Sequence, residues 1–295
     1  MFLPQGGAFE ALGEWCRPGR NVGKEAFELD GVRLPSSLGL SQTGTVDVRL
    51  VSSDQDRLDA RSLVNKMFAW RGYGDQHQIP SGIRSTTFSA WVQGSLVGTV
   101  TLTEDSDQGL AADETFADEL SALRRRPETA LCEMTKLAFD SCEHSTQYLA
   151  TLFNIVLLVG RRRLNCTDLI IEVNPRHVRF YEIMLGFQRL GNLSTNESVG
   201  APSQLMWLAI SEIDKRIEAC RATAPKVRDR SLYNMFFSRQ EELEIISRLE
   251  ALDAVPRAMA ALQPERVDEG FHELLVRLAS AAERGATAVP RPTAY

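Results

Sequence analysis

The chain has 295 residues, a formal net charge of −6, and a composition that is 43% hydrophobic and 24% charged. These values are typical of a globular protein and allow one large domain with extensions, or two small domains. The acidic balance argues against general nucleic-acid binding, which uses a basic surface. The longest apolar stretch, residues 148–160, contains Thr and Asn. It is too short to cross a bilayer about 30 Å thick, so it predicts a buried helix and no transmembrane segment.

The five cysteines are scattered along the chain. None forms a Cys-x-x-Cys pair, and no His lies at zinc-ligand spacing from one, so we expect reduced thiols and no metal site. The N-terminus lacks the basic-then-apolar pattern of a secretory signal. These features predict a cytoplasmic protein.

Residues 1–44 are rich in Gly and Pro and predict an N-terminal extension. From Val46 the pattern becomes regular, and Gly94-Ser95 between two alternating runs predicts a β-hairpin. The order of elements is strand, helix, hairpin, helix, strand, helix, strand, helix and two closing strands, which is a mixed α/β fold class. The expected elements are strand 46–51, helix 54–70, strands 87–93 and 96–103, helix 111–126, strand 130–140, helix 146–163, strand 168–173, helix 176–185, and strands 187–191 and 203–210.

Residues 214–295 are expected to be entirely helical. Within them, residues 268–285 begin with Asp268 as an N-cap, carry an apolar face and end at Gly285. That face must pack against the main domain or against a second subunit, so the C-terminal helices are a candidate homo-oligomer contact. We therefore divide the chain into an N-terminal extension (1–44), an α/β domain (45–213) and a helical C-terminal extension (214–295).

Several short motifs follow one another in the α/β domain. They are Gly98-Thr99, the pairs Asp105-Ser106 and Gly109-Leu110, the helix pattern DEL..LR, and Glu133 ahead of Lys136-Leu137-Ala138. In this order and spacing, residues 46–210 resemble the N-acyl amino acid synthases, GNAT-fold acyltransferases related to the acyl-homoserine-lactone synthases. The resemblance implies a GNAT-like mixed sheet with splayed central strands, whose released edges pair with the amides of a pantetheine arm.

The resemblance implies catalytic roles for two residues. Glu133 would take a proton from the attacking amine, which must be neutral before it can attack a thioester. Tyr181 lies seven positions after Asn174, about two helical turns, and would protonate the departing thiolate. The structural alternatives are a Glu paired with a nearby cation on the sheet and a Tyr that packs in the core.

The resemblance also implies that backbone groups bind the acyl donor. A bulge after Glu133 would aim an N–H group at the thioester carbonyl and stabilise the oxyanion. Many GNAT enzymes continue with a glycine-rich turn for the pyrophosphate of coenzyme A, but this chain reads DSCEHSTQ, without glycine. We therefore expect no permanently bound cofactor, and acyl-phosphopantetheine delivered on acyl carrier protein rather than acyl-CoA. The candidate oxyanion and pantetheine-binding residues are Lys136, Leu137, Ala138, Phe139 and Asn174.

Clusters of arginine stand out in this acidic chain. Acyl carrier protein is strongly acidic, so a local basic patch would orient it. The alternative is a set of solvated helix ends, where the helix dipole favours arginine. The candidate docking residues are Arg161, Arg162, Arg163, Arg176 and Arg179.

The end of the first helix is expected to line the substrate cleft. Trp70 and Tyr73 would cover an acyl chain or an amine, and Arg71 would pair with a carboxylate. The homoserine-lactone synthases carry an Arg where this chain has Thr101, which disfavours S-adenosylmethionine as a substrate.

The sequence therefore predicts an N-acyltransferase that moves a fatty acyl group from acyl carrier protein to the α-amine of an amino acid by direct attack on the thioester. One alternative is an acyl-homoserine-lactone-type signal synthase. Another is a catalytically silent GNAT-like binding module in which Glu133 is structural. The sequence does not specify the amino acid or the acyl length.

Overall fold

The computed structural model describes residues 42–43, 46–140, 145–222, 230–247 and 249. The chain forms two compact units, and the first, residues 1–23 and 37–246, contains the fold described below. The expected helix 268–285 and nearly all of the expected N-terminal extension lie outside the described residues.

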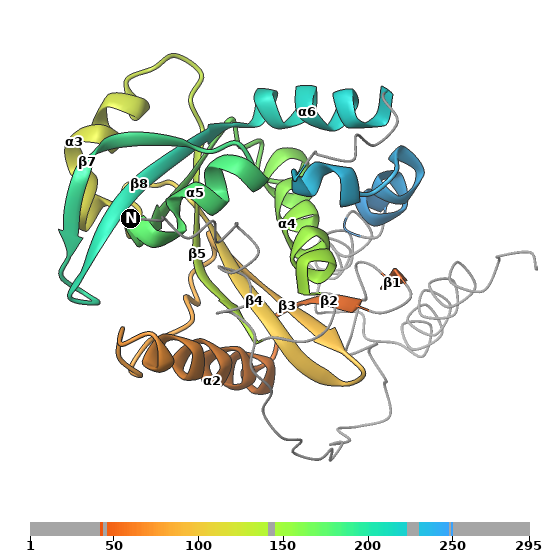
Figure 1. Ribbon diagram of the computed structural model, residues 1–295, viewed down its shortest axis with the longest axis horizontal. Coiled ribbons are helices and arrows are strands. Elements are labelled where there is room, and N and C mark those ends of the chain that lie inside the picture. Colours follow the sequence, from red (N-terminus) through yellow and green to blue (C-terminus); the bar gives the residue numbers. More distant parts are fainter. Residues whose placement is uncertain (1–41, 44–45, 141–144, 223–229, 248, 250–295) are drawn as a thin grey trace, which may run out of the picture. The chain divides into compact units, whose positions relative to one another are not determined.

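The described strands form one eight-stranded mixed sheet (Figure 1). Its order is β1-β2-β3-β4-β5-β6-β8-β7, and among the described pairs only β5 and β6 run parallel, with helix α4 as the crossover between them. This confirms the predicted mixed α/β class. The elements are β1 (Gln42–Thr43), β2 (Val46–Leu50), α2 (Asp54–Trp70), β3 (Ser85–Val92), β4 (Ser95–Glu104), α3 (Asp113–Arg124), β5 (Leu131–Phe139), α4 (Ser145–Arg162), β6 (Asp168–Val173), α5 (Pro175–Met184), β7 (Gln188–Asn196), β8 (Ala201–Ala209) and α6 (Ile210–Ala222).

The parallel strands β5 and β6 separate part of the way along their length. They pair only from Leu131 opposite Asp168 to Glu133 opposite Ile170, although β5 continues to Phe139 and β6 to Val173. Beyond Glu133, the edge of β5 that faces β6 is released from sheet pairing. The predicted splay of the two central strands is confirmed, and Glu133 lies at the point where they part.

β5 also contains a bulge. Thr99 pairs with Ala138 and Thr101 with Thr135, so one residue of β4 faces two residues of β5. Lys136, one of those two, has a φ of 52°, in the left-handed region that residues other than glycine rarely adopt. The bulge therefore lies at Lys136 and Leu137, within the segment where the resemblance implied one.

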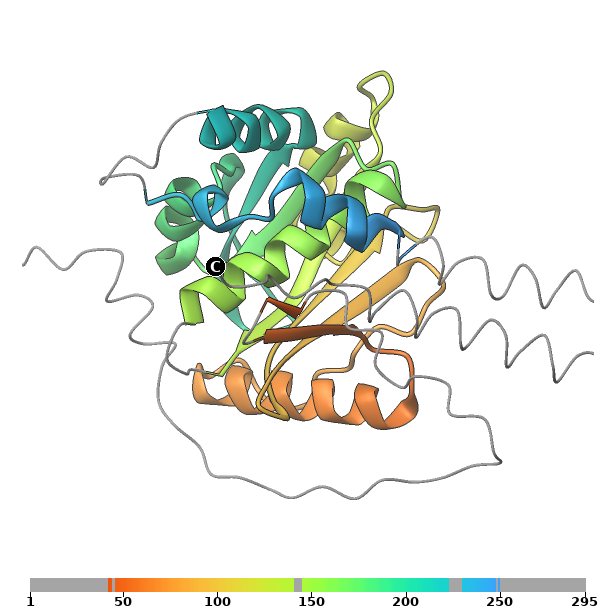
Figure 2. The same ribbon diagram turned by 90° about the vertical axis from the view of Figure 1, so that its right-hand side faces the viewer.

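Helices α2 and α4 cover opposite faces of the sheet (Figures 1 and 2). α4 is apolar around most of its circumference, and Leu152, Phe153 and Ile155 are fully buried. Gly160 of α4 lies next to Leu102 of β4. Among the described residues, no helix is long and apolar enough to cross a membrane. α4 is thus the buried helix that the apolar stretch predicted.

The sheet ends differently from the prediction. Helix α6 begins at Ile210, before residue 214, because the N–H of Ile210 donates to the carbonyl of Thr167 and completes the last sheet contact. Residues 239–247 are helical as expected, but the expectation of an entirely helical C-terminal part is wrong for residues 230–238. They include a short 3₁₀ helix, Leu232–Met235, whose Tyr233 hydroxyl donates to the carbonyl of Leu185 at 2.6 Å.

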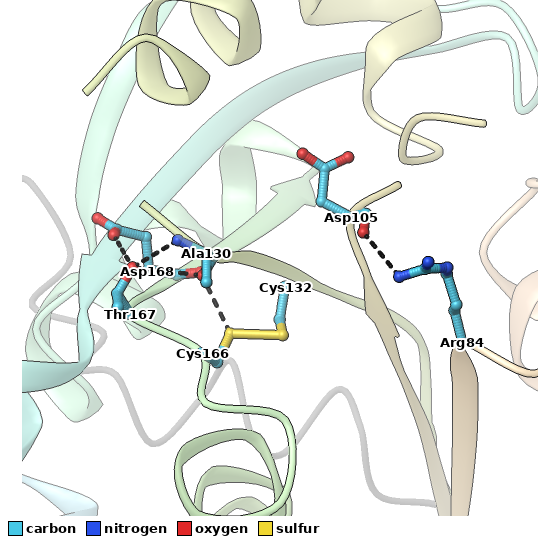
Figure 3. Close-up of a disulfide and its surroundings, with 7 residues drawn as sticks. All are labelled: Arg84, Asp105, Ala130, Cys132, Cys166, Thr167 and Asp168. Carbon is cyan, nitrogen blue, oxygen red and sulfur yellow. Dashed lines mark hydrogen bonds between the residues drawn. A yellow bond between two sulfur atoms is a disulfide. The ribbon is translucent and has the colours of Figure 1, made fainter. Parts of the chain in front are cut away.

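Cys132 and Cys166 form a disulfide, shown in Figure 3. Their Cα atoms are 6.1 Å apart although the residues are 34 positions apart in sequence. β6 begins two residues after Cys166 and pairs with the start of β5, which brings the two side chains together. The prediction of reduced thiols is therefore wrong for this pair, because spacing along the chain does not reveal pairing between strands.

Candidate active site

A cavity of about 680 Å³ opens beside Glu133. Its walls come from the segment after α2, from β3 and β4, from the turn before α3, from the bulged part of β5, and from the β7–β8 turn. The lining residues are Tyr73, Gly74, Asp75, Gln76, His77, Gln78, Pro80, Ser85, Thr103, Gly109, Leu110, Ala111, Glu133, Thr135, Lys136 and Ser198. The cavity thus joins segments from both ends of the domain beside the Glu133 carboxylate.

Glu133 is a buried carboxylate held by backbone donors. It is 1% exposed, and its two oxygens accept hydrogen bonds from the N–H groups of Ala111 at 2.7 Å and Ala112 at 3.2 Å. Burial raises the pKa of Glu133 to about 8, and the charge of Glu172 acts in the same direction, while the two N–H groups lower it. A carboxylate with a pKa in this range is matched to proton transfer near neutral pH.

The backbone donors of Glu133 are braced by an ion-pair triad. Arg124 of α3 donates to Asp105 at 2.6 Å and 2.8 Å, and to both oxygens of Asp113 at 2.6 Å. Asp113 accepts in turn from the N–H of Leu110 at 2.7 Å. The Arg124 guanidinium holds the pKa of Asp113 below its usual range. The triad therefore fixes both ends of the turn that carries the donors.

Lys136 reaches the same cavity as Glu133. Burial lowers the pKa of its ammonium, against the opposing effects of Glu133 and Glu114. Leu137 is half-buried, and Ala138 and Phe139 are buried. Asn174 caps α5: its side-chain oxygen accepts from the N–H of Arg176 at 3.2 Å, and its amide donates to the carbonyl of Pro202.

The predicted substrate residues separate into two groups. Tyr73 lines the cavity, and its hydroxyl accepts from Arg176 of α5 at 2.8 Å, which links the end of α2 to α5. Trp70 and Arg71 do not line the cavity. Trp70 is 59% exposed, and the Arg71 guanidinium lies over its ring. The same guanidinium donates a hydrogen bond to the carbonyl of Met67.

Tyr181 lies on the buried face of α5, outside the cavity that Glu133 lines. Its ring makes edge contacts with Phe180 and Phe187. Burial raises the pKa of its hydroxyl, and the charge of Arg71 opposes that rise. Tyr181 thus packs as a core aromatic, and its hydroxyl lies within the influence of the Arg71 charge.

The predicted docking arginines differ in their surroundings. Arg161 pairs with Asp214 of α6 and lies 3.8 Å from Glu242, so it is an internal ion-pair residue rather than a docking cation. Arg176 is exposed but contacts Tyr73 and His177. The remaining three are exposed, and they are Arg162, Arg163 and Arg179.

Sequence reasoning missed the backbone donors of Glu133 and the hydroxyl groups opposite it. Ser85, Thr103 and Thr135 line the cavity, and the hydroxyls of Ser85 and Thr103 lie 3.0 Å apart. Hydroxyl residues recur at alternate positions in β3 and β4, a pattern that places them on one sheet face. That alternation is the sequence pattern from which the hydroxyl residues of the cavity could have been predicted.

Comparisons with known proteins agree with this architecture. The family model of the N-acyl amino acid synthase FeeM matches residues 59–209, just over half of the chain. The solved structure of FeeM, an N-acyl amino acid synthase from uncultured soil microbes, is 28% identical, with a TM-score of 0.51 over 58% of this chain and 93% of that one. The AHL synthase LasI is 14% identical (TM-score 0.43; 57% and 91% covered), and an acyl-CoA N-acyltransferase from Pseudomonas aeruginosa is 13% identical (TM-score 0.39; 55% and 99% covered). No curated protein sequence matches the chain. The match of the family model, which spans the splayed strands and Glu133, shows that this chain belongs to the N-acyl amino acid synthase FeeM family of N-acyltransferases.

Proposed function

We propose that the protein transfers a fatty acyl group from acyl carrier protein to the α-amine of an amino acid by direct attack on the thioester. The observation that carries this proposal is the position of Glu133. A buried carboxylate with a raised pKa lies where β5 and β6 part, and it opens onto a cavity large enough for an amino acid.

The first step needs a base. The acceptor enters as an ammonium ion, and Glu133 takes one proton from it. The neutral nitrogen then attacks the thioester carbon, and negative charge moves to the carbonyl oxygen. Backbone N–H groups of the bulged segment, Lys136 to Phe139, would stabilise that oxyanion, because the splay leaves the β6-facing edge of β5 without a strand partner.

The second step needs an acid. When the carbon–sulfur bond breaks, the pantetheine thiolate takes a proton from the hydroxyl of Tyr181. The raised pKa of Tyr181 keeps this proton in place at neutral pH, and the charge of Arg71 would stabilise the phenolate that remains. The nitrogen of the intermediate loses its second proton to solvent as the amide forms. Solvent also returns a proton to Tyr181 and accepts the one on Glu133, so the products are an amide, a free thiol and one proton released to solvent.

The choice of donor rests on the segment between β5 and α4. That segment and the first residues of α4, 140–147, read DSCEHSTQ and lack the glycines that cradle a pyrophosphate, which favours a carrier-bound donor with a single phosphate. Exposed Arg162 and Arg179 supply positive charge for an acidic carrier protein.

A carrier-bound donor also favours a cytoplasmic reaction. Cys132 and Cys166, 1% and 5% exposed, are shielded there from soluble thiols.

The test is a reconstituted reaction. Purified protein is incubated with acyl carrier protein loaded with chains of mixed length and with a mixture of amino acids, and the products are identified by mass spectrometry. The expected products are N-acyl amino acids that disappear with Glu133→Gln. Lactones formed only with S-adenosylmethionine would support a homoserine-lactone-type synthase, and no product under any condition would support a silent binding module. Parallel reactions with acyl-CoA identify the donor.

A further inference from the structure

We propose that the side chain of Lys136 binds the carboxylate of the acceptor while its amino group faces Glu133. This inference rests on the proposed function and deepens it, since it assigns the residue that selects an amino acid over a simple amine. An α-amino acid carries both charges on one carbon atom. One molecule can therefore face a carboxylate and an ammonium that line the same cavity.

The bulge is what brings Lys136 to this cavity. Side chains alternate between the two faces of a regular strand. Met134 pairs with Leu102, which lies against Gly160 of α4, so Met134 belongs to the apolar face under α4. Continued alternation would place Lys136 on that same face, where a charged group would be buried among apolar side chains.

The structure instead places Lys136 with Glu133 and Thr135. The positive φ of Lys136 and the extra residue in β5 break the alternation, so Lys136 lines the cavity from the same strand as the carboxylate. A left-handed lysine inside a strand costs conformational energy, and such strain concentrates at functional sites. The bulge therefore directs the Lys136 side chain into the cavity, in addition to releasing backbone N–H groups of β5.

The ammonium of Lys136 also lacks a protein partner at short range. Within the described part of the chain, no hydrogen bond or ion pair within 4 Å joins the Lys136 ammonium to another residue; its charge interactions are with Glu133 and Glu114, beyond that distance. The other cation expected to bind a carboxylate, Arg71, donates to the carbonyl of Met67 and does not line the cavity. Lys136 is therefore the cation available to an acceptor beside Glu133.

The experiment compares acceptors that differ only in the carboxylate. With saturating donor, KM and kcat are measured for the best amino acid and for the amine that remains when its carboxylate is removed. Wild type, Lys136→Met and Lys136→Arg are compared, with Lys215→Met on the exposed face of α6 as the matched control. Methionine keeps the unbranched chain that the bulge accommodates, and thermal unfolding verifies the fold of each variant.

We expect Lys136→Met to raise KM for the amino acid by about 10- to 100-fold, the size of a charge-assisted hydrogen bond, and to leave KM for the amine unchanged. Lys136→Arg should recover most of the loss, and Lys215→Met should behave as wild type. Equal effects on both acceptors, or no effect on either, would overturn the inference.

The failure of the proposed function would look different. In that case the wild-type protein transfers acyl groups to neither acceptor. Binding of the same amino acid and amine to wild type and Lys136→Met, measured by calorimetry, then decides the inference alone. Tighter binding of the amino acid by wild type supports it, and equal binding overturns it.

Discussion

The carboxylate of Glu133 lies 2.7 Å from the backbone nitrogen of Ala111, just before helix α3. This contact joins the proposed base to a turn 22 residues earlier in the chain. A helix N-terminus stabilises negative charge, whereas burial disfavours it, and the pKa of Glu133 reflects both effects. Proton transfer at this site should therefore depend on the turn as much as on the strand.

We expect the pH dependence of the reaction to report the ionisation of Glu133. Because its pKa is raised to about 8, kcat/KM should increase by about tenfold per pH unit below that value and level off above it. Glu133→Gln should lower kcat/KM by about 100-fold or more and remove this part of the profile. The free amine of the acceptor also titrates, so the variant supplies the baseline. A wild-type profile that parallels the variant would exclude Glu133 as the base.

Replacing Arg124 should change the profile without touching the substrate. Arg124→Gln breaks the triad with Asp105 and Asp113, so the turn loses its brace and Glu133 loses well-placed donors. The apparent pKa of kcat/KM should then move upward, and the free energy of unfolding should fall by about 1–3 kcal/mol. Arg125→Gln, at the exposed neighbouring position, is the control. A loss of stability with an unmoved pKa would limit Arg124 to a structural role.

We expect reduction of the disulfide between Cys132 and Cys166 to lower the free energy of unfolding. Closing a loop between residues 34 positions apart should stabilise the fold by about 2–4 kcal/mol. Urea unfolding of wild type with and without reductant, and of the Cys132→Ala/Cys166→Ala variant, measures this difference. Thiol labelling of unfolded protein should detect two further thiols after reduction, with Cys220→Ala as the control for a cysteine outside the bridge. Equal thiol counts before and after reduction would show that the bridge does not form.

Carrier docking should depend on the exposed arginines and not on Arg161. Arg179→Glu and Arg162→Glu should each raise KM for the acyl carrier protein about 3- to 10-fold, more strongly at low salt, and leave KM for the amino acid unchanged. Lys215→Glu on α6 tests whether added negative charge alone has this effect. Unchanged values for both arginine variants would place the docking surface elsewhere.

Much of the fold was readable because it depends on local patterns. Alternation and helical periodicity identified the strands and helices from β2 to β8, and the largely apolar helix 146–163 had to be buried. The resemblance added the splay between β5 and β6 and the importance of Glu133. The predicted boundaries of elements were wrong where a tertiary contact determines them. At Ile210, for example, the N–H donates to the carbonyl of Thr167, and α6 begins there.

By itself, the sequence determined the class of fold and the family, because order and spacing of elements are written along the chain. Only the tertiary structure decided which groups meet. The donors of Glu133, the bridge from Cys132 to Cys166 and the ion pair that occupies Arg161 all join residues distant in sequence. Strand pairing and helix packing set these distances in space, and no local pattern encodes them. The bulge that turns Lys136 toward Glu133 is of the same kind, because its position follows from the register between β4 and β5.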